Sequence, residues 1–218
     1  AKRGDLLITD PRTGEILAMV SLPGGATSGL AALTTPYEPG STLKPFTVAA
    51  ILNEGVATMG DSADTGAGQW RVAGRTLHDV HPKGGYLTLA EALRYSSNVA
   101  KLAQGLTPAE QYENLRDFGF GVITGIGIPG EASGILRRPD RWSAQSAASL
   151  AIGYEISVTP LQMAMAYGAL ANGGKLMEPR LIREVRDRRG RVVTRNRPRV
   201  VRRVVPKSVT REITPVLV

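Results

Sequence analysis

The chain reads PGSTLKPF at residues 39–46, and this stretch decides how the rest of the sequence is interpreted. Ser41 and Lys44 are three residues apart, so a helix places their side chains on one face. Pro45 has no N–H and is tolerated only in the first turn of a helix, which predicts a helix from about Thr42 to Asn53. The Ser41 hydroxyl then lies at the positive end of the helix dipole, beside free backbone N–H groups.

A serine in this position can act as a nucleophile, and its own N–H can help to hold a developing oxyanion. A serine hydroxyl is weak until a base removes its proton. Lys44 can be that base only when it is neutral, which requires burial or a nearby positive charge to lower its pKa. The alternative is an ordinary helix cap followed by a solvated lysine, and an isolated Ser-x-x-Lys spacing favours that alternative. The surrounding sequence must therefore decide.

A second segment, Ser96-Ser97-Asn98, follows a predicted helix that begins with the capping signature at Thr88. A loop at a helix end can direct both polar side chains of such a motif towards a cleft. Residues 39–46 resemble the active-site serine motif of penicillin-binding proteins, and residues 96–98 resemble their Ser-x-Asn motif. The two motifs together outweigh the reading of Ser41 as a simple cap.

The resemblance extends in order over nearly the whole chain and is to the monofunctional (class B) proteins of elongation or division. It implies an α+β fold of the serine β-lactamase and penicillin-binding-protein type, with an antiparallel sheet flanked by helices, a helix-rich lobe and an incomplete C-terminal end. The expected parts are an opening hairpin with the nucleophile helix (1–60), a mainly helical lobe (61–178), and a basic hairpin with a return to the sheet (179–218). The similar segments are residues 10–19, 118–121, 124–131, 153–162 and 171–174.

The resemblance also implies roles for the matching residues in peptidoglycan D,D-transpeptidation. Ser41 would be acylated by the D-Ala-D-Ala end of a stem peptide, or by a β-lactam, and Lys44 would be its general base. Ser96 would relay a proton to the leaving amine, and Asn98 would bind the peptide backbone of the substrate. A neighbouring stem amine would resolve the acyl-enzyme, and no metal or organic cofactor is implied.

The third motif of the family, Lys-Thr-Gly, is absent from the 218 residues, and the nearest string is Lys207-Ser208-Val209. We therefore expect a second polypeptide or a missing segment to supply that strand. The resemblance further implies cell-wall synthesis proteins as partners. It places the parent protein at the extracytoplasmic face of the bacterial cytoplasmic membrane, anchored by a segment that this sequence lacks.

The first half of the chain carries local signals for short strands. Apolar runs at residues 6–9 and 16–20 surround a turn-rich segment and predict a β-hairpin. Residues 61–85 are polar and rich in glycine, which predicts irregular structure with short strands.

The second half begins with helix signals. Capping-box signatures open predicted helices at Thr107 and Thr159, with stops near Gly119 and Asn172. Residues 179–194 alternate around a turn, which predicts a β-hairpin with arginines on its solvent face.

The formal net charge of +8 is concentrated in one segment. Of the 27 basic residues, eleven are arginines between Arg180 and Arg203, against only Glu184 and Asp187, so the rest of the chain holds 16 basic and 17 acidic residues. The alternation of arginine with valine and isoleucine favours a solvated or lipid-facing hairpin over nucleic-acid binding.

Two further patterns are set aside. GIGIPG at residues 125–130 matches the dinucleotide fingerprint, but Pro129 stands where a helix should begin. His78 and His81 lack a convincing third ligand, and the chain contains no cysteine, so zinc binding is not predicted.

Two alternative functions stay open at this point. A β-lactam sensor or a serine β-lactamase would share the fold and the serine chemistry, and would differ in how fast water resolves the acyl-enzyme. A non-catalytic basic binding module would keep Ser41 as a mere cap and would form no covalent β-lactam adduct.

Overall fold

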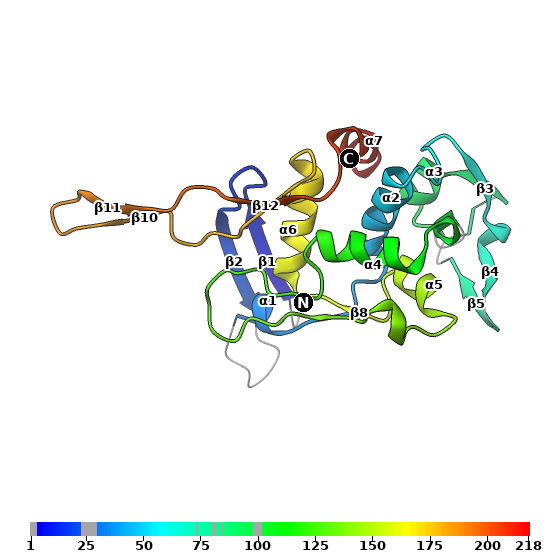
Figure 1. Cartoon of the computed structure of the whole chain (residues 1–218), viewed down its shortest axis with the longest axis horizontal. Coiled ribbons are helices and arrows are strands. Elements are labelled where there is room, and N and C mark those ends of the chain that lie inside the picture. The colour runs from blue at the N-terminus through cyan, green and yellow to red at the C-terminus, as the bar shows by residue number, and fades with distance from the viewer. Residues whose placement is uncertain (1–3, 23–29, 73, 80–81, 84, 98–101) are drawn as a thin grey trace.

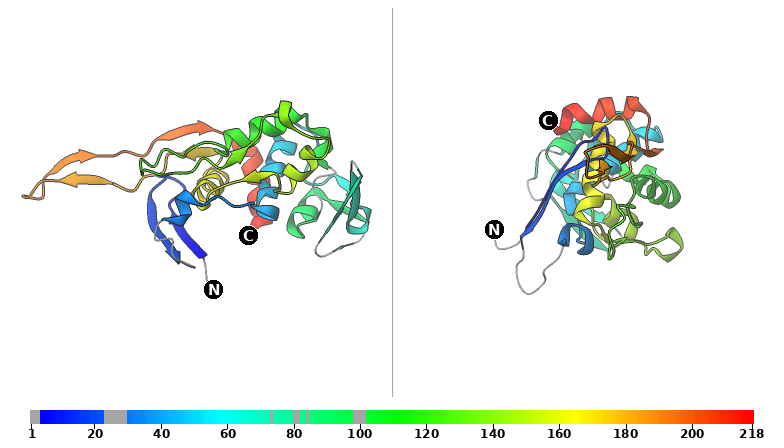
Figure 2. Two further views of the ribbon diagram at one scale, coloured as in Figure 1. Left: turned by 90° about the horizontal axis from the view of Figure 1, so that it is seen from below. Right: turned by 90° about the vertical axis from the view of Figure 1, so that its left-hand side faces the viewer.

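The computed structural model describes residues 4–22, 30–72, 74–79, 82–83, 85–97 and 102–218. Helices gather into a central body, short antiparallel strand pairs lie around it, and one hairpin projects far from it (Figures 1 and 2). This mixture of helices and antiparallel strands is the predicted α+β arrangement. Among the described residues the strands form six two-stranded pairs rather than one continuous sheet.

The predicted opening hairpin is confirmed. Strands β1 (Gly4–Thr9) and β2 (Ile16–Leu22) pair in antiparallel register. Asp10 organises the turn between them, because its carboxylate accepts hydrogen bonds from Arg12 N at 2.9 Å and from Thr13 Oγ1 at 2.9 Å. The hairpin packs against helix α6 (Pro160–Ala171) and the short helix α1 (Ala31–Thr34).

Helix α2 (Lys44–Asn53) lies at the centre of the molecule and follows a 3₁₀ turn, η1 (Gly40–Leu43). Every residue from 44 to 51 is buried, as expected for a helix that is surrounded on all sides. It contacts α3 (Leu89–Arg94), α4 (Pro108–Asp117) and α7 (Lys207–Leu217). The predicted start close to Ser41 and the predicted end at Asn53 are both confirmed.

The three predicted capping boxes are present. In α3, α4 and α6 the threonine side chain accepts a hydrogen bond from the backbone N–H three residues later. The side chain of that third residue, a glutamate or glutamine, accepts a bond in return from the threonine N–H. The expected stops hold as well, because α4 ends at Asp117 before Gly119, and α6 ends at Ala171 before Asn172.

Short elements complete the central part of the chain, as predicted for residues 61–85. Strand β3 (Ser62–Asp64) pairs with β6 (Tyr86–Thr88), β4 (Gln69–Val72) with β5 (Arg75–His78), and β7 (Ile135–Leu136) with β8 (Ile156–Ser157), all in antiparallel register. The remaining helical elements are η2 (Gly66–Gly68), η3 (Leu102–Gly105), η4 (Pro139–Arg141) and α5 (Ser146–Ala151).

The basic hairpin forms, with two differences from the prediction. The first strand, β10 (Glu184–Arg186), begins at Glu184 rather than near Pro179. It pairs with β11 (Val192–Arg195) in antiparallel register. Val185 and Val193, on opposite faces of this ribbon, are both exposed, because no second layer from the described part of the chain covers either face. Figure 1 shows the hairpin extending away from the helical body.

The C-terminal end differs from the expected return to the sheet. Strand β12 (Val200–Arg203) does pair with β9 (Lys175–Met177), but the chain then forms helix α7. Val, Thr and Ile are frequent in α7 and Pro215 lies inside it, so its composition is typical of strand or loop. The buried Val209 and Ile213 are nevertheless four residues apart, and this spacing indicates a helix where the composition does not.

Candidate active site

Ser41 lies in the η1 turn that leads directly into α2, and its side chain is exposed. Lys44 begins α2 and is only 4% exposed. The first turn of a helix leaves backbone N–H groups without intrahelical partners, so donors are available around Ser41. An exposed hydroxyl therefore lies three residues before a buried amine, at the start of a buried helix.

The buried Lys44 amine is held by Ser96. Its Nζ donates to the Ser96 carbonyl oxygen at 2.5 Å and lies 3.1 Å from Ser96 Oγ. Burial lowers the pKa of Lys44 to about 8, and the Asp79 carboxylate, which acts in the opposite direction, only partly offsets this. Two of the predicted site residues, 52 positions apart in the sequence, are thus brought together.

The loop after α3 directs neighbouring serines in different directions. Ser96 has a φ of +54°, a left-handed conformation that is uncommon for residues other than glycine. Ser97 is buried and donates its hydroxyl proton to Asp79 Oδ2. Asn98, the remaining residue of the predicted site, lies outside the described residues.

The nucleophile turn is held by segments far along the chain. Tyr167 donates its hydroxyl proton to the Thr42 carbonyl oxygen at 2.8 Å, and Gly40 N donates to the Gly153 carbonyl oxygen at 2.9 Å. Gly153 has a φ of +88°, and a Cβ atom there would lie 1.9 Å from Gly40 O. Position 153 therefore accepts only glycine in this conformation.

Helix α2 itself is fixed by polar and aromatic contacts. Thr47 Oγ1 donates to the Ala151 carbonyl oxygen at 2.9 Å, and Asn114 Nδ2 donates to the Phe46 carbonyl oxygen at 2.9 Å. The Phe46 ring meets three other aromatic rings edge to face, at centroid distances of 4.8, 5.3 and 5.1 Å, from Phe118, Phe120 and Tyr167. These contacts restrict movement of the Ser41–Lys44 turn.

Sequence reasoning missed Asp79, Gly153 and Tyr167. Asp79 lies in the polar, glycine-rich segment 61–85, and no local pattern there marks a carboxylate that becomes buried. Gly153 lies in segment 153–162, which resembles the family, but the need for its positive φ depends on the close approach of Gly40. Tyr167 lies within α6, and no local pattern distinguishes it from a core aromatic residue.

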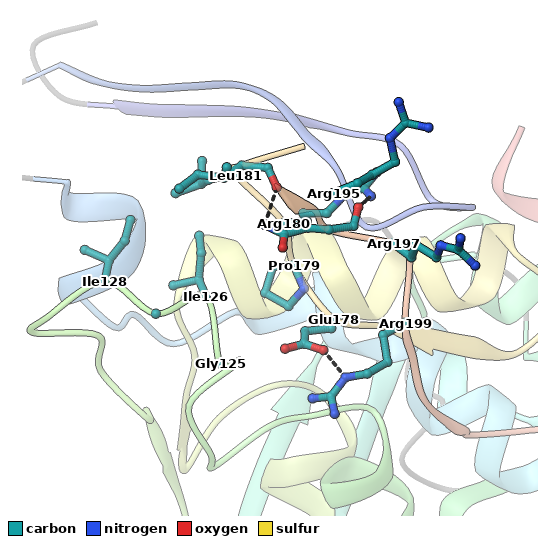
Figure 3. Close-up of a pocket in the computed structure, with 13 residues that line it drawn as sticks. Gly125, Ile126, Ile128, Glu178, Pro179, Arg180, Leu181, Arg195, Arg197 and Arg199 are labelled. Carbon is teal, nitrogen blue, oxygen red and sulfur yellow. Dashed lines mark hydrogen bonds and ion pairs between the residues drawn. The ribbon is translucent and has the colours of Figure 1, made fainter. Parts of the chain in front are cut away.

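A separate cavity of about 520 Å³ lies at the root of the basic hairpin, away from the Ser41 motif (Figure 3). The former dinucleotide candidate, residues 125–128, forms one wall. Figure 3 shows Arg199 directed at Glu178, with which it forms an ion pair. No helix follows Gly130 directly, which agrees with the rejection of a dinucleotide site.

Two other kinds of site find no support among the described residues. His78 is exposed, and no group of three or more His, Cys, Asp or Glu side chains there is arranged to hold a metal. His81 lies outside the described residues. No helix in the described part of the chain has the length and apolar content to cross a bilayer.

The structure thus presents a serine–lysine pair at the start of a buried helix on an α+β scaffold. The family model of the penicillin-binding protein transpeptidase domain matches residues 4–218. The chain therefore belongs to the penicillin-binding-protein transpeptidase family.

Curated relatives agree with this assignment. The chain is 35% identical over 222 residues to the penicillin-binding protein PbpB of Mycolicibacterium smegmatis, covering 95% of the chain and 34% of that relative. It is 33% identical over 186 residues to the peptidoglycan D,D-transpeptidase FtsI of Escherichia coli K12, covering 80% of the chain and 31% of that relative. The chain thus spans about a third of the length of these relatives.

Solved structures support the same family and fold. The transpeptidase domain of Burkholderia pseudomallei penicillin-binding protein 3 is 31% identical, with a TM-score of 0.87 over 100% of this chain and 62% of that one. Penicillin-binding protein 3 of Mycobacterium tuberculosis in complex with aztreonam is 32% identical, with a TM-score of 0.87 over 98% of this chain and 50% of that one. The predicted fold class and the predicted family are confirmed.

Proposed function

We propose that this chain carries the acylation machinery of a peptidoglycan D,D-transpeptidase, with Ser41 as nucleophile and Lys44 as general base. The observation that carries the proposal is the buried Lys44 amine, held by Ser96 one helical turn from an exposed Ser41. The names of the relatives and the β-lactam complexes of similar proteins support the same chemistry.

The hydrogen bonds of Lys44 suit a base. A neutral amine has two N–H donors and one lone pair. Both donors have an acceptor in Ser96, through its carbonyl oxygen and its hydroxyl oxygen. The lone pair is then left to accept the Ser41 proton.

The shifted pKa supplies the neutral form of this amine. With a pKa of about 8 instead of 10.5, the neutral fraction at pH 7 rises roughly 300-fold.

The reaction that follows is acyl transfer. Ser41 Oγ forms a bond to the carbonyl carbon of the penultimate D-alanine as its proton passes to Lys44. Collapse of the tetrahedral intermediate breaks the peptide bond, and the leaving D-alanine amine takes a proton through Ser96. The amine of a neighbouring stem peptide then attacks the acyl-enzyme, which releases Ser41 and forms the cross-link. A β-lactam would acylate Ser41 by the same first steps.

The wider assignments are proposals of the same kind. Asn98 would hydrogen-bond the substrate backbone. Stem peptides and β-lactams would be the ligands, and cell-wall synthesis proteins the partners. The site would work at the extracytoplasmic face of the cytoplasmic membrane. Residues 1–60, 61–178 and 179–218 would be parts of one transpeptidase domain rather than separate domains.

Labelled penicillin added to the full-length protein, followed by peptide mapping, tests the proposal. We expect a single adduct on Ser41 that is lost in Ser41→Ala and retained in Ser62→Ala, since Ser62 is exposed on β3 outside the site. An adduct on Ser96, or one that survives Ser41→Ala, would overturn the assignment. Absence of any adduct would favour the non-catalytic basic module. Rapid hydrolysis of the adduct would indicate a β-lactamase.

A further inference from the structure

Asp79 is a buried carboxylate that the proposed reaction does not use. Asp79 is 9% exposed, and its backbone N–H donates to the Gly68 carbonyl oxygen at 2.8 Å. This bond joins the segment after β5 to the η2 turn. The carboxylate accepts the Ser97 hydroxyl proton on Oδ2, and Oδ1 has no hydrogen-bond partner in the described part of the chain.

A buried carboxylate with one unpaired oxygen is unfavourable unless an opposite charge compensates it. Lys44 carries that charge when it is protonated, and Asp79 is the one charged group in the described residues that acts on the pKa of Lys44. No ion pair joins the two side chains directly among the described contacts, so the interaction acts at a distance, between two buried groups that water screens poorly.

We propose that Asp79 is a positioning residue for acylation, which holds the Ser96 loop through Ser97 and stabilises the Lys44 ammonium that forms when Ser41 is deprotonated. This inference rests on the proposed function of Ser41 and Lys44. Asp79 acts through Ser97 and Lys44, and no described hydrogen bond joins it to Ser41.

The first role follows from the geometry of the loop. Ser96 is held in a left-handed conformation that a non-glycine residue adopts only when its surroundings enforce it. Ser97 is the next residue, and its buried bond to Asp79 prevents the loop from relaxing. Ser96 therefore stays within reach of Lys44 with both its carbonyl and its hydroxyl oxygens.

The second role follows from charge. Proton transfer from Ser41 to Lys44 creates an ammonium in a buried position, and a nearby carboxylate stabilises that product. Without the carboxylate, Lys44 would be neutral at lower pH but would also be a weaker base. Asp79 thus raises the strength of the base at some cost to the fraction that is neutral.

Asp79→Asn tests the charge while preserving the shape and an oxygen that accepts from Ser97. We expect the acid limb of the acylation rate in the full-length protein to move to lower pH by roughly half to one unit. We expect the plateau rate to fall about threefold, as a weaker base requires. Asp140→Asn makes the same chemical change at an exposed position on η4 and should alter neither quantity.

Ser97→Ala tests the loop separately, because it keeps the Asp79 charge and removes the hydrogen bond. We expect a plateau rate about tenfold lower, from misplacement of Ser96, with the acid limb unmoved. Wild-type acid limb and plateau in Asp79→Asn, with Ser41 still acylated, would overturn the inference. Should Asp79→Asn fail to fold, a wild-type plateau in Ser97→Ala would overturn it instead. Failure of the wild-type protein to be acylated at Ser41 would reject the proposed function itself.

Discussion

Gly153→Ala is the substitution that most directly tests how the nucleophile turn is held. A methyl group at position 153 would lie 1.9 Å from Gly40 O and 2.7 Å from Gly40 N, both backbone atoms that cannot rotate away. Gly40 N also donates to the Gly153 carbonyl oxygen at 2.9 Å, so the clash would break this bond. The residue that moves, Gly40, is bonded directly to Ser41.

The expected loss in the free energy of unfolding has two parts, the strained backbone conformation and the broken hydrogen bond. Forcing alanine into the left-handed region costs about 1–2 kcal/mol, and the lost hydrogen bond adds about 1 kcal/mol. Gly125→Ala is the matched control, since Gly125 has a φ of +83° and a methyl group added there would meet no heavy atom within 4 Å. We expect Gly125→Ala to lower the free energy of unfolding by the conformational part alone, and Gly153→Ala by at least about 1 kcal/mol more.

The functional consequence should exceed the stability consequence. Displacing a nucleophile by about 1 Å can reduce its reaction rate about 100-fold, and we expect a loss of this order for penicillin acylation of Gly153→Ala. The assays are denaturant unfolding and the second-order acylation rate constant, both on the full-length protein. Equal unfolding losses in the two variants, together with acylation of Gly153→Ala within threefold of wild type, would refute this account of the turn.

The site and its surroundings support three more predictions. The acylation rate should rise with pH around an apparent pKa of about 8, because the neutral form of Lys44 is the base. Lys44→Ala should lower the plateau rate about 10²–10⁴-fold, a far larger effect than its cost to stability. An acid limb that reflects a pKa near 10 would contradict the burial argument. Tyr167→Phe should lower the free energy of unfolding by about 1 kcal/mol and slow acylation several-fold, because it removes the hydrogen bond to Thr42 O but keeps the ring contacts. Tyr86→Phe, the control at an exposed position, should change neither quantity. Three exposed arginines of the basic hairpin, Arg186, Arg188 and Arg189, can be replaced together with glutamine. The acylation rate should stay within about threefold of wild type, a barrier change under roughly 0.7 kcal/mol. A larger loss would show that the hairpin contributes to the cleft.

Local chemistry made much of the fold predictable from the sequence. A capping box needs only residues within one turn, and all three that the sequence indicates are present. The start of α2 near Ser41 follows in the same way from the position of Pro45. Helix α7 was missed because its composition and Pro215 suggest strand or loop, although the spacing of its buried residues is helical.

The candidate site also contains residues that a local sequence pattern reveals and residues that it does not. Ser41 and Lys44 form a local pattern that the sequence reveals, and the pairing of Lys44 with Ser96 could be expected only through the family resemblance. Asp79 and Tyr167 carry no local signal. Their partners lie 18 and 125 positions away, so their roles depend on how distant segments pack.

Substitutions at the exposed nucleophile and at the residues that hold its turn should differ in their effect on stability. Ser41, the proposed nucleophile, is exposed, whereas its proposed base Lys44 is buried in α2. The residues that hold them are constrained by backbone contact, as at Gly153, or by packing, as at Phe46 with its three ring partners. Loss of the exposed Ser41 hydroxyl should therefore abolish acylation and leave the free energy of unfolding nearly unchanged. Loss of a supporting group should lower both together, because the same contacts that place Ser41 also hold α2 in the core. Plotting acylation loss against unfolding loss for Ser41→Ala, Tyr167→Phe and Gly153→Ala should place the first apart from the other two.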